Sequence, residues 1–166
     1  KVLSVKNWKS KGFLEKVAEQ SADSHLKITL KVENPEEILA RTKECQSKFK
    51  NSKVSQECLI IEAKTELKLQ QYEKAEKQFT TLMSQVKDAN KVQPILLMRS
   101  DARNKLGRLD DSVHDLFQYQ TMTEFKDADI TQTILQHYWF KRDTQHLDTL
   151  LKNPKVCAGK NAEACE

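Results

Sequence analysis

Apolar residues recur along most of this chain at the spacing of an amphipathic helix. The clearest stripe advances in steps of three and four residues through Tyr72, Ala75, Phe79, Leu82 and Val86. The preceding segment, 58–69, has the same spacing in Leu59, Ala63 and Leu67. Because only Gln70 and Gln71 separate the two segments, the pattern predicts an antiparallel helix hairpin with a tight turn.

The arrangement of helix, turn and helix recurs twice downstream. Gly107 is suited to cap a helix marked by Ile95, Met98, Ala102 and Leu106, directly before a helix marked by Leu109, Val113 and Leu116. A last hairpin pairs a helix marked by Ile130, Ile134 and Tyr138 with one marked by Leu147, Leu150 and Leu151. Asn153 and Pro154 end it, because the residue before a proline disfavours helical geometry.

One more helix is predicted upstream, from Pro35 through Phe49. Asn34 is suited to cap it, and Glu36 and Glu37 place negative charge in its first turn. The residues that mark the register near the start of the second helices are Ala40, Ala75, Ser112 and Leu147. They follow one another at intervals in the mid-thirties, and helix pairs at such a period are typical of an α-solenoid.

The first 33 residues fit this pattern worst. Leu26, Ile28, Leu30 and Val32 alternate with polar residues, which by periodicity favours a strand. Val2, Leu3 and Val5 are compatible with a second extended piece, and 13–20 with a short helix between the two. The alternative is a degenerate first helix of an N-terminal repeat. We therefore divide the chain into an N-terminal segment (1–33), a helical repeat domain (34–153) and a C-terminal tail (154–166).

The repeats resemble the tetratricopeptide repeat, a helix-turn-helix unit of 34 residues. The best copy matches the family's small, large, aromatic, small and aromatic positions with Ala63, Leu69, Tyr72, Ala75 and Phe79. A second copy offers Ser100, Leu106, Gly107, Ser112 and Leu116, and a third keeps Tyr138 but has Leu147 where alanine is usual. The resemblance covers 59–151 and implies an all-α, right-handed superhelix of antiparallel hairpins.

The resemblance also implies a concave face, lined by the first helix of each repeat, that holds a peptide or helix of a partner. Carried over by register, the expected partner-binding residues are Lys64, Leu67, Lys68, Asp101, Asn104, Lys105, Gln136, Trp139 and Phe140. Ile60, Leu97 and Gln132 accompany them. Family members that bind the carboxylate of a chaperone tail carry a set of Lys and Asn side chains from which Ile60, Leu97 and Asp101 depart, so that ligand is disfavoured.

The sharpest local feature is the run Tyr138, Trp139 and Phe140. Three consecutive residues cover most of a helix circumference, so these rings cannot all face one core. At least one should reach a groove, a further repeat or solvent. The last repeat can instead bury them against its second helix and the tail, and the functional interpretation is an aromatic anchor for a partner.

The composition argues against several classes of fold and function. Three Gly and three Pro in 166 residues are too few for a turn-rich β-sandwich, and the glycines lie too far apart for a phosphate-binding loop. Apolar runs such as 58–61 and 95–98 are far shorter than a membrane span. The net charge of +4 comes from lysines spread along the chain, so nucleic-acid binding is the weaker alternative.

Four cysteines can form two local pairs. Cys45 and Cys58 are equally far from the connector at Asn51 and Ser52, so a hairpin brings them face to face. Cys157 and Cys165 can close the tail. Two disulfides favour the periplasm, the secretory pathway or the extracellular space over the cytoplasm. The alternatives are reduced, packed thiols and a four-cysteine zinc site, which the spacing disfavours.

No arrangement in the sequence predicts catalysis, a metal or a cofactor. Ser112, His114 and Asp115 point in different directions on one helix, so we interpret them as a polar helix surface. His137 and His146 lie on either side of a turn but lack a clear third ligand or base. We expect a non-enzymatic scaffold that binds a protein or peptide as part of a larger assembly or array. The chain begins at Lys1, which fits a processed product or an excised fragment.

Overall fold

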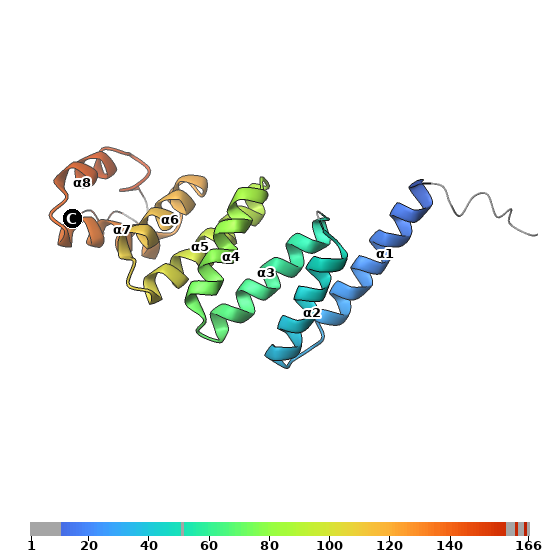
Figure 1. Cartoon of the computed structure of the whole chain (residues 1–166). Helices are drawn as coiled ribbons and strands as arrows, with labels where there is room; N and C mark the ends of the chain where they lie inside the picture. Colours follow the sequence, from blue (N-terminus) through green and yellow to red (C-terminus); the bar gives the residue numbers. More distant parts are fainter. Residues whose placement is uncertain (1–10, 51, 159–161, 163–164, 166) are drawn as a thin grey trace, which may run out of the picture. The chain divides into compact units, whose positions relative to one another are not determined.

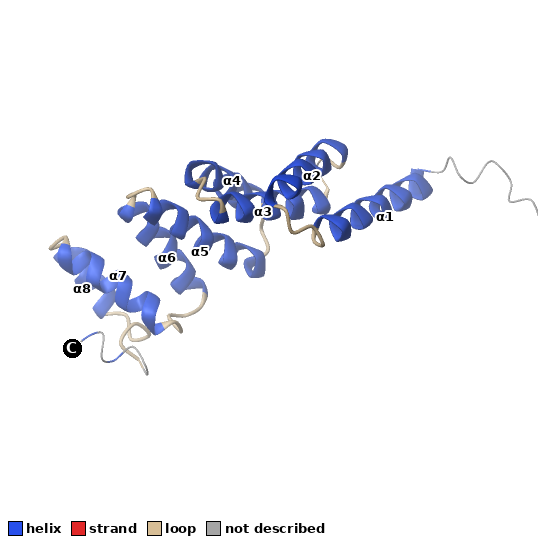
Figure 2. Cartoon of the chain, turned by 90° about the horizontal axis from the view of Figure 1, so that it is seen from below, coloured by secondary structure: helices blue, strands red, loops and turns tan. Residues whose placement is uncertain are grey.

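The structure is a computed structural model that describes residues 11–50, 52–158, 162 and 165. Throughout these residues the regular secondary structure is helical, with no strand, as the ribbon in Figure 2 shows. The helices are α1 (Lys11–Thr29), α2 (Pro35–Lys48), α3 (Lys53–Lys68), α4 (Tyr72–Gln85), α5 (Ala89–Lys105), α6 (Leu109–Met122), α7 (Ala128–Phe140) and α8 (Thr144–Leu151). The prediction of an all-α fold is confirmed.

The contacts divide the chain into two compact units, 1–78 and 79–166, with the division inside α4. In the first unit α2 and α3 lie side by side and α1 packs against both (Figure 1). In the second unit α6 packs against α5 and α7, and α7 packs against α8. The expected repeat domain, 34–153, therefore includes parts of both units.

The predicted strand over 26–32 is wrong, because α1 continues to Thr29. Ala22 and Thr29 are almost fully buried and lie two helical turns apart, so they hold this segment as a helix against the rest of its unit. Ile28 and Leu30, which suggested a buried sheet face, are 51% and 65% exposed. The suggested piece at Val2, Leu3 and Val5 lies outside the described residues.

The ends of α2 and α3 follow the sequence signals. Asn34 Oδ1 accepts hydrogen bonds from the backbone amides of Glu36 at 2.8 Å and Glu37 at 3.3 Å, and Pro35 opens the helix. Ser52 caps α3 by accepting from the Ser55 amide at 3.0 Å. The helix therefore starts at Lys53, earlier than the apolar pattern alone suggests.

Two disulfides confirm the predicted cysteine pairing. Cys45 and Cys58 join α2 to α3 with a Cα–Cα distance of 6.4 Å, and both are fully buried. Cys157 and Cys165 join the ends of the tail at 5.8 Å. Both side chains contact a core formed by Val113, Phe125, Ile134, Leu135, Leu150 and Val156. These bonds favour an oxidising, extracytoplasmic environment.

Three hairpins share one type of turn. Gln70, Gly107 and Arg142 follow α3, α5 and α7 with left-handed φ values of 60°, 73° and 55°, and the next helix begins two residues later. In each turn two backbone amides bond back to the preceding helix, as in Gln71 N to Glu66 O at 2.9 Å. We call these three residues the left-handed turn residues. Their recurrence gives the repeats a common register.

The residues that mark the register occupy the same helix position in these three hairpins. Ala75 and Ser112 are buried at the fourth position of α4 and α6, and Leu147 is half-buried at the same position of α8. Ser112 meets the preceding helix directly, since its Oγ lies 2.9 Å from Ser100 Oγ. Ala40 departs from the pattern, because it is exposed and lies farther into α2.

Candidate functional site

The run of three aromatic residues lies at the end of α7. Asp127 caps this helix by accepting from the Ile130 amide at 3.2 Å, and Thr131, Ile134 and Leu135 are its buried residues. The opposite side of the helix is thereby turned to solvent, since side chains three and four residues apart share a face.

Only the first of the three rings is held by the protein. Tyr138 packs against the core of the second unit and stacks on the His146 ring, with centroids 4.9 Å apart and planes 6° from parallel. Burial raises the pKa of Tyr138 above its usual value, with the Asp143 charge adding to the effect. His146 is fixed in turn by Asp143 Oδ2 at 2.7 Å from its Nδ1.

The other two rings reach solvent. Trp139 is 72% exposed and Phe140 is 81% exposed. Gln136 lies beside them on the preceding turn and is also exposed. We call Gln136, Trp139 and Phe140 the aromatic surface of α7. The last repeat therefore does not bury all three rings of the aromatic run.

Phe140 also borders a hollow of about 440 Å³ at the turn between α5 and α6. Its lining comprises Gly107, Leu109, Asp110, His137, Phe140 and Lys141. Leu109 is 51% exposed, so the hollow combines two accessible apolar side chains with charged ones. It extends the aromatic surface toward the neighbouring hairpin.

An ion cluster fixes the wall of this hollow. Asp110 Oδ1 lies 2.9 Å from His137 Nε2, and Lys141 Nζ donates to both Asp110 oxygens at 2.6 Å. The hydrogen bond from Lys141 lowers the pKa of Asp110, assisted by the charges of Lys141 and His137. The sequence placed Asp110 in a first turn but gave no sign that it bridges α6 to α7.

The expected partner-binding residues occupy equivalent positions in three hairpins. Counted back from the left-handed turn residue, Lys64, Asp101 and Gln136 share one position, and Leu67, Asn104 and Trp139 share another. Lys68, Lys105 and Phe140 share a third. All nine are exposed except Leu67, which is half-buried. The first member of each trio belongs to the first unit and the other two to the second.

The interpretation of Ser112, His114 and Asp115 as a polar surface needs correction. Ser112 is 5% exposed and bonded to Ser100, and Asp115 is fully buried. Arg99 donates to the Asp115 carboxylate at 2.6 Å and 3.0 Å, and Arg103 donates at 2.9 Å. His114 instead bonds Gln118 at 2.8 Å. The three side chains therefore have separate partners.

The buried pairing of Arg99 and Arg103 with Asp115 was not predicted, because these residues lie on two helices and are charged types that normally face solvent. The spacing of Arg99 and Arg103, one turn apart and opposite Asp115 across the hairpin, was the only available signal.

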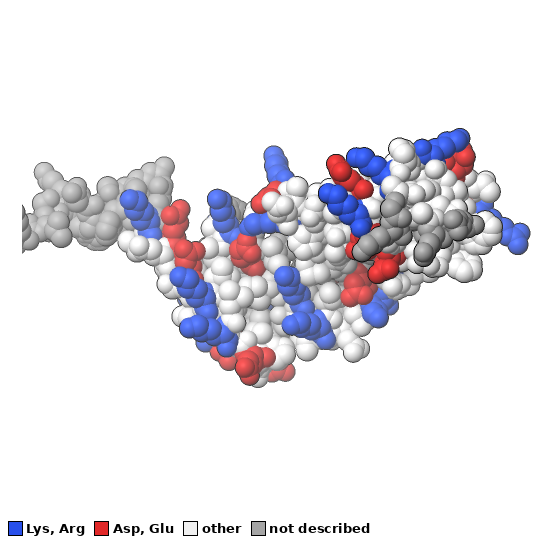
Figure 3. Space-filling model, turned by 180° about the vertical axis from the view of Figure 1, so that it is seen from behind, with Lys and Arg blue, Asp and Glu red and all other residues white. Residues whose placement is uncertain are grey.

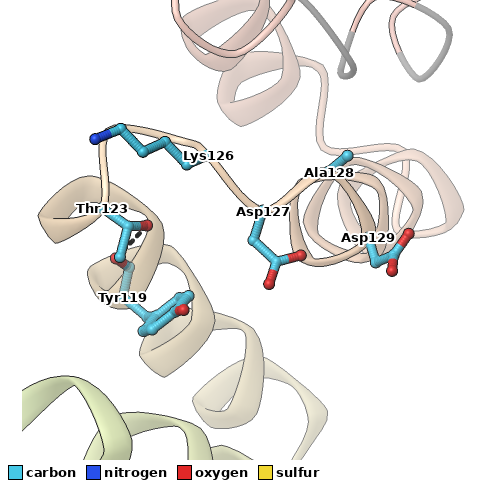
Figure 4. Close-up of a pocket in the computed structure, with 6 residues that line it drawn as sticks. All are labelled: Tyr119, Thr123, Lys126, Asp127, Ala128 and Asp129. Atoms are coloured by element: carbon cyan, nitrogen blue, oxygen red, sulfur yellow. Dashed lines mark hydrogen bonds between the residues drawn. The ribbon is translucent and has the colours of Figure 1, made fainter.

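A second hollow, of about 500 Å³, lies where α6 passes into α7 (Figure 4). Two of its polar side chains are engaged in the turn, since Thr123 Oγ1 donates to Tyr119 O at 3.1 Å and Asp127 caps α7. The Lys126 side chain extends away from the carboxylates of Asp127 and Asp129. We see no grouping of acid, base and nucleophile in this hollow.

Charged side chains on the face in Figure 3 alternate in sign. Lys and Arg form separate groups with Asp and Glu beside many of them, rather than one basic band. Local ion pairs among the described residues include Arg41 with Glu37 at 2.8 Å and Lys141 with Asp110 at 2.6 Å.

The two histidines of the last hairpin have separate partners. His137 and His146 bond different carboxylates, and the described residues contain no group of three or more His, Cys, Asp or Glu side chains placed to hold a metal ion. Among the helices that the structure describes, none combines the length and the apolar composition needed to cross a bilayer.

Compared with models of protein families, with curated proteins and with solved structures, the chain matches none.

Proposed function

We propose that this protein is a non-enzymatic scaffold that binds a protein partner through the aromatic surface of α7. The observation that carries the proposal is the exposure of Trp139 and Phe140, at 72% and 81%. Adjacent exposed rings on a well-packed helix are costly to leave in water and are the side chains that most often dominate binding energy at interfaces.

The surroundings favour a peptide or helix as the occupant. Gln136 offers an amide beside the rings, and the hollow at Leu109 gives space for an apolar side chain next to Phe140. A partner helix with apolar residues on one face can cover both rings while its polar groups meet Gln136 and Lys141.

The proposal includes tetratricopeptide-like hairpins, in which the nine equivalent residues mark the partner-binding side of the first helix of each hairpin. The shared turn geometry of Gln70, Gly107 and Arg142 supports it, because identical turns at a nearly constant period repeat the same hairpin. Two disulfides favour the periplasm, the secretory pathway or the extracellular space as the site of action.

Affinity capture tests the proposal. The full chain is compared with a Trp139→Ala, Phe140→Ala variant and with a matched control, Ile28→Ala, Leu30→Ala, which removes two exposed apolar side chains from α1 and its end. Circular dichroism checks that all three chains are folded. A partner retained by the parent and control but lost by the α7 variant supports the proposal, and a partner retained equally by all three contradicts it.

A further inference from the structure

A third hollow of the second unit is lined mainly by rings and lies outside the aromatic surface of α7. Its volume is about 340 Å³, and three helices contribute to it, because α7 packs against both α6 and α8. We call it the α8 hollow. Its lining includes Phe117 from α6, Tyr138 from α7, His146, Thr149 and Leu150 from α8, and Asn153 from the turn that follows.

The apolar wall of the α8 hollow belongs to the packed core of the unit. Leu150 is only 6% exposed, and Phe117 and Tyr138 pack against the same core. Phe117 also meets Phe125 edge-on, with ring centroids 6.0 Å apart. These side chains are therefore held in place before a ligand arrives, which lowers the entropic cost of binding.

The polar wall contains an imidazole whose two nitrogens differ in role. His146 Nδ1 lies 2.7 Å from Asp143 Oδ2, and the ring is also held by its stack on Tyr138. The hydrogen bond that the His146 amide donates lowers the pKa of Asp143, so this carboxylate is ionised and can only accept. Nδ1 therefore carries a proton, and Nε2 of the neutral ring is an acceptor. No described residue is bonded to Nε2.

The remaining polar groups of the lining are neutral. Asn153 Oδ1 accepts from the Lys155 amide at 3.0 Å, which leaves the side-chain amide nitrogen of Asn153 as a donor. Thr149 is exposed, and its Oγ1 donates to Gln145 O at 2.8 Å. Among the described residues that line the hollow, none is Lys, Arg, Asp or Glu. A charged ligand would find no counter-ion in this lining, so a neutral ligand is favoured.

We propose that the α8 hollow binds a neutral aromatic group with one N–H or O–H donor, the chemistry of a phenol or an indole. The ring packs on Phe117 and Leu150, and its donor meets His146 Nε2. The volume lies at the lower end of the range of ligand pockets, which suits one ring or a fused pair. The inference does not rest on partner binding by the aromatic surface of α7, because that surface takes no part in the lining.

Ligand titrations of the full chain, followed by NMR, test the site. The probes are p-cresol and indole, with 4-methylanisole as a matched compound that keeps the ring and lacks the donor. Thr149→Trp places a large side chain at the exposed edge of the hollow. Its control is Thr133→Trp on α7, because Thr133 is also exposed and its Oγ1 also donates to the carbonyl four residues earlier, at 2.8 Å. His146→Phe keeps a ring and removes Nε2. Circular dichroism checks that each variant is folded.

We expect p-cresol and indole to bind the parent and Thr133→Trp equally, and to bind Thr149→Trp at least about tenfold more weakly. The parent should prefer p-cresol to 4-methylanisole by about fivefold, and His146→Phe should lose this preference. Absence of saturable binding to the parent, equal binding to both tryptophan variants, or an unchanged preference in His146→Phe would overturn the proposal.

Two further probes identify the source of the aromatic group. N-acetyltyrosinamide and N-acetyltryptophanamide carry the same rings on a peptide backbone. Tighter binding of these amides than of p-cresol and indole would assign the hollow to a tyrosine or tryptophan side chain of a polypeptide. Weaker binding of the amides would assign it to a free small molecule. Either result supports a site for the phenol and indole class, provided that Thr149→Trp weakens it.

Discussion

Arg99 and Asp115 form a bidentate ion pair inside the second unit, with donor–acceptor distances of 2.6 Å and 3.0 Å. Asp115 is fully buried. The pair joins α5 to α6, and Arg103 adds a third hydrogen bond at 2.9 Å. Planar guanidinium groups suit such paired recognition of a carboxylate. The hairpin is therefore joined by charge as well as by apolar packing.

Asp115→Asn is expected to lower the free energy of unfolding by about 3–5 kcal/mol, because two buried guanidinium groups lose their carboxylate. Urea denaturation followed by circular dichroism measures the change. The control is Asp111→Asn, whose bridge to Arg108 at 2.8 Å lies between half-exposed side chains and is worth less than about 1 kcal/mol. Equal losses in the two variants would show that the buried pair has no special role.

Glu66→Gln is expected to stabilise the protein at neutral pH. Burial, reinforced by the Glu62 charge, raises the pKa of Glu66 in the folded state. The Glu66 carboxyl therefore holds its proton more tightly in the folded protein than in the unfolded chain. The stabilisation that comes from the protonated carboxyl is lost as the pH rises through its folded-state pKa.

Denaturation of parent and variant across the range from about pH 4 to pH 8 measures this difference. The two curves should converge at the acidic end and separate by about 1 kcal/mol or more at the neutral end. Parallel curves would mean that Glu66 is ionised in the folded protein without cost.

Removal of the Cys45–Cys58 bond, by Cys45→Ala, Cys58→Ala, is expected to cost about 3 kcal/mol, as the chain-entropy model gives for a loop of this size. The bond joins α2 to α3 at a fully buried position, so it also affects the packing of the first unit. Thermal unfolding under oxidising conditions measures the loss. Addition of a reductant should also destabilise the parent. A control variant in which the cysteines of both disulfides are replaced should keep its stability when the reductant is added.

Gln70→Gly and Arg142→Gly are each expected to stabilise the protein by about 1 kcal/mol. Both positions have left-handed backbone geometry, which costs a residue with a Cβ atom about 1–2 kcal/mol and costs glycine almost nothing. Gly107→Ala should have the opposite effect, although the space around this position is open, because its φ is 73°. Chemical denaturation of the three variants tests whether the turns are equivalent.

Local patterns predicted most of the helices because their signals come from neighbouring residues. Asn34 with Pro35 set the start of α2, and Gly107 set the end of α5. The start of α5 at Ala89 was less visible, because Pro94 lies inside the helix and usually marks a helix start. Asp88 caps it instead, accepting from the Asn90 amide at 3.0 Å.

Features set by distant contacts were predicted less well. The alternation at Leu26 and Ile28 favoured a strand, but burial of Ala22 and Thr29 against the other helices of the unit stabilises this segment as a helix. Asp115 was interpreted as a surface residue because its arginine partners are remote in sequence. Helix geometry predicted only that at least one ring of the run Tyr138, Trp139 and Phe140 would not face a single core, and it did not indicate which of them would be exposed.

The role of the α7 surface can be tested most directly by site-specific photocrosslinking. A photoreactive phenylalanine analogue is placed at Phe140 in one chain and at Gln145, an exposed position of α8, in another. A covalent adduct to one protein from position 140, absent from position 145 and suppressed when Trp139→Ala is added, is the predicted result. Equal adducts from both positions, or none from position 140 in a folded chain, would contradict the proposal that the aromatic surface of α7 binds a partner.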